Sequence, residues 1–272
     1  MALRWTLLAA GLGDGRVVIV DARTLAPVAE AQAGGGGLAG DGGVDSVAGS
    51  RVAAVSFSPD STMLAAAGAD RCVHIFANVR GRFSPVARCV GHSTTVAALD
   101  WSEDNRMLRS TCQNLEMLHW TAPGGKPVSG DVRDVRWSTH NSLVGFPVMG
   151  VWEEGRAAPS DLNSIDRSRG GRHLATGDDE GQVRILHYPC VTRNAPAKTY
   201  GGHSSHVSSV RFSTGDKWLA STGSKDRALM LWRVTGMDQG SEGMPRVSAP
   251  WEKGAQGKSV APPPRTRPSP IG

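Results

Sequence analysis

A three-strand pattern that recurs along the chain limits what the chain can fold into. The most complete copy runs from His203 to Trp232: an alternating apolar strand, a strand of small residues, a turn that contains Asp226, and a strand that ends in tryptophan. A degraded copy runs from His92 to Trp120. Repeats of about 40–45 residues with four strands each are typical of the blades of a β-propeller. We therefore expect an all-β interaction module rather than an enzyme.

The turn before the third strand keeps a fixed spacing in these copies. Asp70, Asn114 and Asp226 each stand six residues before the aromatic residue that ends the next strand, and Asp14 stands six residues before Val20. Asp and Asn suit such a turn because their side chains accept hydrogen bonds from the nearby backbone and tolerate left-handed conformations. On this spacing we predict five units, at residues 4–30, 51–88, 92–130, 161–198 and 203–234.

The first unit begins without its first strand. We therefore predict that residues 1–235 form an incomplete, open β-propeller of the WD-repeat type, with about five recognisable four-stranded blades. Five units that start inside a blade leave two open edges, so we expect the isolated chain to be an open arc of marginal solubility.

Three segments fall outside the repeat pattern. A Gly-rich stretch at residues 33–43 is predicted to be a flexible loop. An irregular insert at residues 131–160 is predicted to supply an outer strand and to cross to the next blade. The last segment, residues 236–272, is rich in proline and basic residues, and we predict a disordered tail there.

Composition excludes several classes of partner. No run of 18 apolar residues occurs, so we expect no transmembrane helix and no membrane partner. The net charge is +5, but the basic residues are not interleaved with a platform of aromatic side chains, which argues against a nucleic-acid partner. The cysteines show no paired spacing, which favours reduced thiols in the cytoplasm over disulfides: Cys72, Cys89, Cys112 and Cys190.

The last unit predicts a buried hydrogen-bond chain. The Trp232 indole would donate to the hydroxyl of Ser221 (or Thr222), the hydroxyl to His203, and His203 to Asp226. Each member left unpaired would cost about 1–3 kcal/mol, so such a chain fixes the register of the blade. The alternative is a Ser-His-Asp hydrolase, which we disfavour because the sequence has no nucleophile elbow and no oxyanion-hole signal. The residues predicted to hold the blades together are Asp14, Asp70, His92, Asn114, Trp120, His203, Ser221, Asp226 and Trp232.

Other motifs that suggest chemistry are weak. His203 and His206 have a spacing found in zinc sites, but no third ligand lies nearby in the sequence. The glycines from Gly11 to Gly15 lie between two predicted strands with no helix after them, so they do not form a dinucleotide-binding loop. Asp178, Asp179 and Glu180 lack the spacing of a calcium loop. We therefore predict no catalytic residue, no metal and no cofactor.

Several segments are more specific than a generic blade: LVGFPVMGVW at 143–152, YPC at 188–190 and YGGHSSHV at 200–207. In these segments, and in the order of the repeats over roughly residues 51–234, the chain resembles the C-terminal propeller of the echinoderm microtubule-associated protein-like family. The resemblance implies a non-enzymatic scaffold that binds tubulin and other cytoskeletal partners, in the cytoplasm on microtubules or in the cilium. In that hypothesis, basic loops and the basic tail meet acidic tubulin surfaces.

The alternative is a generic WD-repeat adaptor that assembles protein complexes and has no microtubule role. Neither hypothesis assigns partner-binding residues, and both leave the oligomeric state open.

Overall fold

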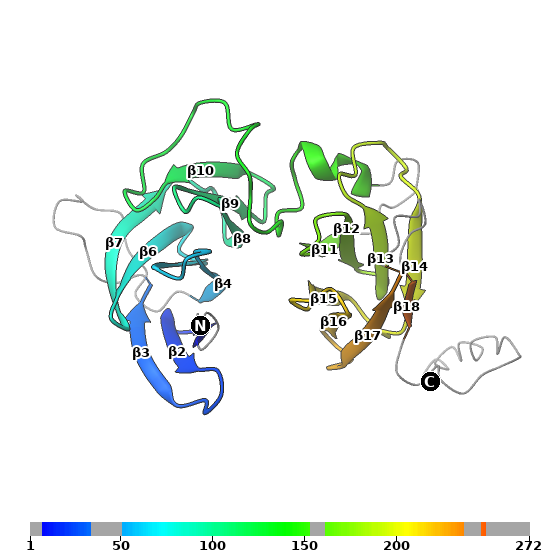
Figure 1. Ribbon diagram of the computed structural model, residues 1–272, viewed down its shortest axis with the longest axis horizontal. Coiled ribbons are helices and arrows are strands. Elements are labelled where there is room, and N and C mark those ends of the chain that lie inside the picture. The colour runs from blue at the N-terminus through cyan, green and yellow to red at the C-terminus, as the bar shows by residue number, and fades with distance from the viewer. Residues whose placement is uncertain (1–6, 34–50, 153–160, 237–245, 249–272) are drawn as a thin grey trace, which may run out of the picture.

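The computed structural model describes residues 7–33, 51–152 and 161–236 in full, together with the backbone of residues 246–248. In these ranges the strands form five antiparallel sheets, and within each sheet neighbouring strands follow one another along the chain. Figure 1 shows the sheets arranged around a common centre, with β4, β8, β11 and β15 innermost and β3, β7, β14 and β18 outermost. The predicted all-β, open propeller is therefore confirmed.

Each sheet is one blade. Blade 1 contains β1 (Leu7–Gly11), β2 (Arg16–Asp21) and β3 (Pro27–Gln32); blade 2 contains β4 (Val52–Phe57), β5 (Met63–Gly68), β6 (Cys72–Val79) and β7 (Arg82–Val90). Blade 3 contains β8 (Val96–Trp101), β9 (Met107–Cys112) and β10 (Met117–Thr121). Blade 4 contains β11 (Leu162–Arg167), β12 (His173–Asp178), β13 (Gln182–His187) and β14 (Ala197–Gly201). Blade 5 contains β15 (Val207–Phe212), β16 (Trp218–Gly223), β17 (Leu229–Thr235) and β18 (Arg246–Ser248).

The core lies between the blades, and β5 shows why its sequence consists of small residues. Successive side chains of a strand point to opposite faces of its sheet. Leu64 and Ala66 pack toward blade 1, whereas Ala65 and Ala67 pack toward blade 3. All six residues of β5 are buried. Because β5 is packed against a neighbouring blade on each face, only small side chains fit at most of its positions, which explains the run of alanines.

The innermost strands share a structural irregularity. In β4, β8, β11 and β15 the pairing register shifts by one residue near the start of the strand, before Ala54, Ala98, Ser164 and Ser209. A bulge of this kind bends a strand and increases its twist. Its repetition at the same place in four blades shows that the blades are copies of one unit.

The insert after blade 3 differs from its prediction. Past β10 the chain makes two isolated bridges, Pro127 with Trp120 and Trp137 with Ser102, so the described part of the insert contributes no regular outer strand to blade 3. The backbone N–H groups of Thr121 and Val128 close the first bridge by donating to the carbonyls of Lys126 and His119, and the pairing goes no further. The chain then crosses to blade 4, where the 3-10 helix η1 (Phe146–Val151) buries Val148 and Val151 against β11 to β13.

Blade 5 corrects the predicted extent of the tail. Arg246–Ser248 forms β18, which pairs with residues 233–235 of β17 and completes a four-stranded sheet. Backbone pairing at the edge of β17 places these three residues in the blade, although their sequence shows no strand period of its own. The rest of the predicted tail, the Gly-rich stretch at 34–43 and the insert residues 153–160 lie outside the described residues.

Two blade faces are left uncovered in the described part of the chain. Leu229 and Leu231 of β17 are 66% and 48% exposed, on the face turned away from blade 4. Leu8 of β1 is 50% exposed, on the face turned away from blade 2. The ring of described blades is thus open between blade 5 and blade 1. The described helix, η1, falls far short of the length needed to cross a bilayer.

Candidate functional site

Blade 5 contains the hydrogen-bond chain that its sequence suggested. The Trp232 indole N–H donates to Ser221 Oγ at 2.8 Å, and Ser221 Oγ lies 2.8 Å from His203 Nε2. His203 Nδ1 lies 2.8 Å from the Asp226 carboxylate. An ionised carboxylate can only accept, so Nδ1 carries the imidazole proton and Nε2 accepts from the serine hydroxyl. The N–H of Ala228, followed by His203, holds the pKa of the Asp226 carboxyl below its usual range.

The same geometry argues against a hydrolase at this place. Ser221 is fully buried, and its oxygen already accepts the indole N–H of Trp232. A seryl nucleophile must reach a substrate carbonyl, which a hydroxyl inside the blade cannot do. The arrangement connects His203, which precedes β15, to Ser221 on β16 and Trp232 on β17. It therefore holds the strands of the blade together.

Blade 3 carries an incomplete version of this chain. The Trp120 indole N–H donates to Ser110 Oγ at 2.8 Å, and Ser110 Oγ lies 2.6 Å from His92 Nε2. Asn114, however, turns its amide to Ser93 Oγ at 3.2 Å instead of meeting the imidazole. His92 Nδ1 is left without a hydrogen-bond partner.

The remaining predicted turn residues act locally. Asp14 accepts the backbone N–H of Arg16 at 3.1 Å, and Asp70 accepts that of Cys72 at 3.2 Å. Both bonds span two residues, as does the bond from Ala228 to Asp226. This shared contact is the physical reason for the fixed spacing in the sequence. The Asp70 carboxylate also lies 2.6 Å from Nε2 of His74, four residues on.

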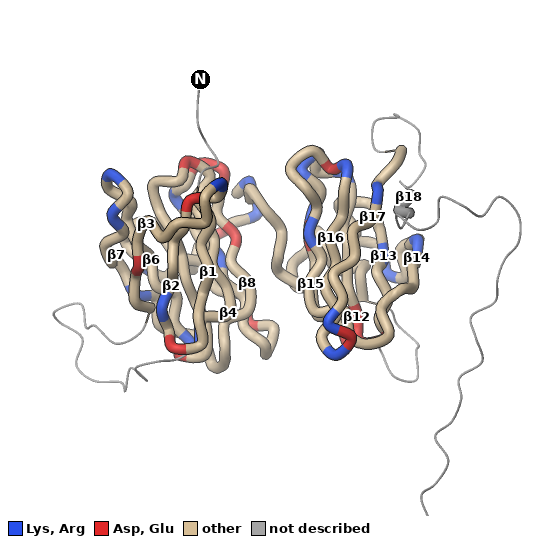
Figure 2. Tube along the Cα trace, turned by 90° about the horizontal axis from the view of Figure 1, so that it is seen from below, with Lys and Arg blue, Asp and Glu red and all other residues tan. Residues whose placement is uncertain are grey.

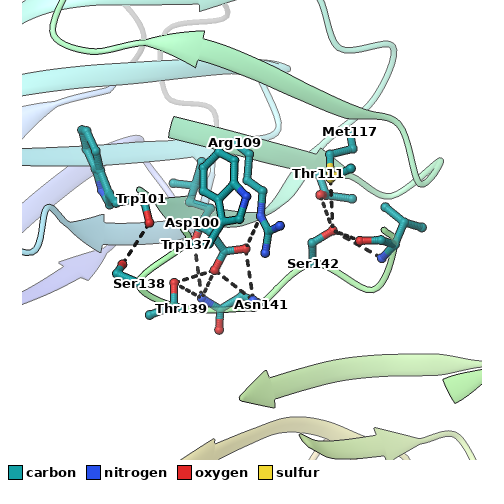
Figure 3. A network of polar contacts seen from close by, with 12 residues as sticks. Asp100, Trp101, Arg109, Thr111, Met117, Trp137, Ser138, Thr139, Asn141 and Ser142 are labelled. Carbon is teal, nitrogen blue, oxygen red and sulfur yellow. Dashed lines mark hydrogen bonds and ion pairs between the residues drawn. The ribbon is translucent and has the colours of Figure 1, made fainter. Parts of the chain in front are cut away.

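A buried polar network holds the insert against blade 3, and no pattern in the sequence indicates it (Figure 3). Asp100 on β8 accepts from Arg109 Nε on β9 at 3.0 Å. From the insert, Thr139 donates to Asp100 at 2.5 Å, and Asn141 donates both its backbone N–H and its side-chain amide at 2.9 Å. The Arg109 guanidinium lies over the Trp137 ring, 4.7 Å from its centroid. Burial acts to raise the pKa of Asp100, but the Arg109 charge and these donors hold it below its usual range.

The network continues to blade 4. Arg167 of β11 donates to the backbone carbonyl of Trp137 at 2.6 Å. His140, next to the network, is almost fully buried, and its Nε2 has no hydrogen-bond partner. Burial, and after it the positive charge of Arg109, lowers the pKa of His140 to about 3. His140 is therefore neutral at physiological pH. We call this network the seam.

The turns at the two ends of the blades differ in their balance of charge, although both kinds of charged residue occur at each end (Figure 2). At the end where first strands turn into second strands and third into fourth, the described basic residues are Arg23, Arg80, Arg82, Arg106, Lys126, Arg169, Arg172, Arg193, Lys217 and Arg233, against Asp21, Asp60, Glu103, Asp104 and Asp216. At the opposite end, Asp14, Asp70, Glu116, Asp161, Asp178, Asp179, Glu180 and Asp226 stand against Arg16, Arg51, Arg71, Lys225 and Arg227. We call the first of these the basic end.

A pocket of about 520 Å³ opens at the basic end, across blades 4 and 5. Arg172, Lys217 and Arg233 line it, and Asp216 is the acidic residue in its lining. The Asp216 carboxylate accepts the backbone N–H groups of Arg169 and Gly170 at 2.8 and 2.7 Å, which holds the two turns together. The Asp216 carboxylate is therefore already hydrogen-bonded within the protein. The other charged side chains that line the pocket are basic, so the pocket suits an acidic ligand.

Sequence reasoning missed both the seam and the basic pocket. The seam joins residues about 40 positions apart, and the pocket joins turns separated by 47 positions. The one signal for the pocket was the recurrence of basic residues in the turns after the first strand of blades 4 and 5, at Arg169, Arg172 and Lys217.

Comparison with known proteins places this architecture in a family. Residues 3–234 match the model of the echinoderm microtubule-associated protein second β-propeller. The chain is 39% identical over 188 residues to human echinoderm microtubule-associated protein-like 1, and 35% identical over 235 residues to human echinoderm microtubule-associated protein-like 3. These matches cover 68% and 85% of the chain, but 23% and 25% of the relatives. The chain thus spans about a quarter of their length.

Solved structures support the fold. The β-propeller domain of Myceliophteria thermophila Cps50 (Swd1) superposes with a TM-score of 0.54 at 16% identity, covering 73% of this chain and 71% of that one. A chain of the mitotic checkpoint complex superposes with a TM-score of 0.61 at 18% identity, covering 85% of this chain and 74% of its own. At such identities the likeness concerns the fold alone.

Proposed function

The chain belongs to the echinoderm microtubule-associated protein family, and we propose that it is a non-enzymatic scaffold that binds tubulin through its β-propeller. The observation that carries this proposal is the family match over residues 3–234, which spans the five blades except for the end of β17 and the short strand β18. The relatives are microtubule-associated proteins by name. The proposal extends that association to this chain, and the relatives' names give no separate support for a ciliary location.

The basic end is the surface that we assign to tubulin. An acidic partner is attracted over a distance of about a Debye length, roughly 8–10 Å at physiological salt, so a surface with clustered cations gains most from such a partner. The basic pocket gives this surface a place where acidic side chains could be enclosed between Arg172, Lys217 and Arg233. The opposite end of the blades, where acidic residues outnumber basic ones, would be repelled.

Co-sedimentation with microtubules across a salt series tests the proposal. We expect the purified chain to pellet with microtubules at low salt, to be released as salt rises, and to be displaced by polyglutamate. The variant Lys217→Glu with Arg233→Glu reverses two charges at the basic end and should weaken binding about tenfold or more. Lys225→Glu with Arg227→Glu is the matched control, because it makes the same charge change in blade 5 at the opposite end. Failure of the wild-type chain to pellet at low salt would refute tubulin binding.

A second function, a generic adaptor without a microtubule role, is favoured by the uncovered blade faces. Leu229 and Leu231 form an exposed apolar surface. Such a surface suits an apolar sheet or helix of another protein better than it suits an acidic partner such as tubulin. The two functions predict different responses. Adaptor binding through this face would be insensitive to salt and lost in Leu229→Thr with Leu231→Thr, while the charge reversals at the basic end would leave it unchanged.

A further inference from the structure

The buried imidazole of His92 has a ring nitrogen without a hydrogen-bond partner. In blade 5 the corresponding nitrogen of His203 meets Asp226, but in blade 3 the residue at that position is Asn114, which bonds to Ser93 instead. The His92 side chain is fully buried, and Nδ1 is unsatisfied. A buried polar atom in this condition costs about 1–3 kcal/mol and needs an explanation.

Two further donor atoms face this nitrogen. Glu116 Oε2 lies 3.9 Å from His92 Nδ1, and Cys112 Sγ lies 3.4 Å from the same carboxylate oxygen. All three atoms lie within 4.8 Å of one another. Cys112 ends β9 and Glu116 precedes β10, so the turn between these two strands brings both residues together. His92 lies beside this turn, in the segment that leads into β8. Among the described residues, this is the one place where three such metal-binding donors gather.

We propose that His92 Nδ1, Cys112 Sγ and Glu116 Oε2 bind a divalent cation of the zinc type, with water as a fourth ligand. Imidazole nitrogen, thiolate and carboxylate are the ligands that Zn²⁺ takes in proteins, and three protein ligands with one open position is a common arrangement. Zinc–ligand bonds of about 2.0–2.3 Å place tetrahedral ligand atoms roughly 3.3–3.8 Å apart. The observed separations of 3.4 Å (Cys112 Sγ to Glu116 Oε2) and 3.9 Å (His92 Nδ1 to Glu116 Oε2) are close to these values. The remaining two atoms, His92 Nδ1 and Cys112 Sγ, lie within 4.8 Å of each other, so they have to approach by at most about 1 Å.

The surroundings already orient the ligands. His92 Nε2 lies 2.6 Å from Ser110 Oγ, which fixes the ring and, with the proton on Nε2, leaves Nδ1 free to bind metal. The backbone N–H of Ser93 donates to Glu116 Oε2 at 2.9 Å and holds the carboxylate in place. The Glu116 side chain is 43% exposed, so a cation and its water can enter from solvent on that side. On binding, the Cys112 thiol loses its proton to solvent and forms the sulfur–metal bond.

At two of the three ligands, protonation does not oppose metal binding near neutral pH. Burial lowers the pKa of His92, so the imidazole is neutral. Hydrogen bonds from Ser93 lower the pKa of Glu116, so its carboxylate is charged. Two of the three ligands therefore have the required protonation state before the metal arrives.

Cobalt substitution of the purified full chain tests the site. We expect one Co²⁺ to bind per chain with a sulfur-to-cobalt charge-transfer band, and Zn²⁺ to displace it. Cys112→Ser should abolish the band and weaken Zn²⁺ binding by about 100-fold or more, beyond the roughly 10–100-fold that loss of an outer-shell partner costs. Cys190→Ser is the matched control, because it removes a buried thiol in blade 4 and should leave both readouts unchanged.

A second variant distinguishes metal binding from folding. Asn114→Asp supplies the carboxylate that blade 5 has, so His92 Nδ1 should donate to it and no longer bind metal. This variant should fold at least as well as wild type in chelator-treated buffer and lose Co²⁺ binding. Binding without a sulfur band, a band that persists in Cys112→Ser, or unchanged affinity in Asn114→Asp would each overturn the proposal, whatever the outcome of the microtubule experiment.

Discussion

His203 Nδ1 lies 2.8 Å from the Asp226 carboxylate, while the equivalent nitrogen of His92 in blade 3 has no such acceptor. The two imidazoles share their other contact, because Nε2 of each lies against a buried serine that accepts a tryptophan N–H. The two blades therefore differ in one connection of a shared chain. That difference allows the contribution of the chain to stability to be measured blade by blade.

Trp232→Ala should lower the free energy of unfolding by about 3–5 kcal/mol. Trp232 is 2% exposed and packs with Val210 and Leu219 between blades 4 and 5, and its removal also deprives Ser221 of a donor. Denaturant unfolding monitored by circular dichroism measures the loss. Trp218→Ala is the control, because Trp218 is 43% exposed and should cost about 1 kcal/mol or less. Equal costs for the two variants would remove Trp232 from the core.

The spacing of acidic and amide residues before aromatic residues located the turns because a turn is a local structure. Asp14, Asp70 and Asp226 each accept a hydrogen bond from the backbone N–H two residues ahead. Because both partners are close in the sequence, the spacing alone predicts this contact. The same is true of Trp120 and Trp232, whose position in the third strand follows from the strand period. Features of this kind account for the blades that were predicted.

The parts that were missed depend on contacts between distant segments. Asp100 pairs with Asn141 across the insert, and Asp216 bonds the turn at Arg169, so neither partner can be identified from its own neighbourhood. β18 has three residues, too few for a period to be visible, and it forms because β17 offers an unpaired edge. That Asn114 turns away from His92 is a matter of side-chain orientation, which spacing does not specify.

Asp100→Ala should destabilise the chain by about 3–5 kcal/mol, because it leaves the buried Arg109 charge without its partner. It should also free the insert, which bonds to Asp100 through Thr139 and Asn141. We expect faster proteolysis between residues 131 and 152 than in wild type, with the blades still resistant. Asp100→Asn with Arg109→Met should be less destabilised than Asp100→Ala, since it buries no unpaired charge. Intact protease resistance in Asp100→Ala would contradict the role assigned to the seam.

Acid should weaken the fold below about pH 6.5. Burial lowers the pKa of His140 to about 3 and that of His173 to about 4, from an ordinary value of 6.5. Between those values and 6.5 the unfolded chain binds protons that the folded chain does not, so stability falls as pH falls, by about 1.4 kcal/mol per pH unit for each uncompensated proton. Burial raises the pKa of Asp166 to about 6, which acts in the opposite direction between about pH 6 and 3.8.

Two variants separate these opposing contributions to the pH profile. His140→Gln removes one of the imidazoles that favour unfolding in acid, so the decline between pH 6.5 and 4.5 should become shallower. Asp166→Asn removes the opposing carboxyl, so the decline should become steeper. Unfolding midpoints measured at half-unit steps of pH provide the comparison. Profiles that are parallel in all three proteins would show that these groups do not titrate as their burial implies.

The uncovered face of blade 5 should make the isolated chain self-associate. On β17, Leu229 and Leu231 point away from blade 4, and exposed apolar patches of this kind promote association. Leu229→Thr with Leu231→Thr keeps residues that suit a strand while removing most of the apolar surface. Sedimentation velocity should show more monomer for this variant, with an unfolding midpoint close to that of wild type because both side chains are exposed. Val79→Thr, at a 63% exposed position in blade 2, is the control and should change neither readout. The open arc would be refuted by a wild-type chain that stays monomeric at high concentration and melts as late as closed propellers do, since uncovered blade faces lack the burial that stabilises a complete ring.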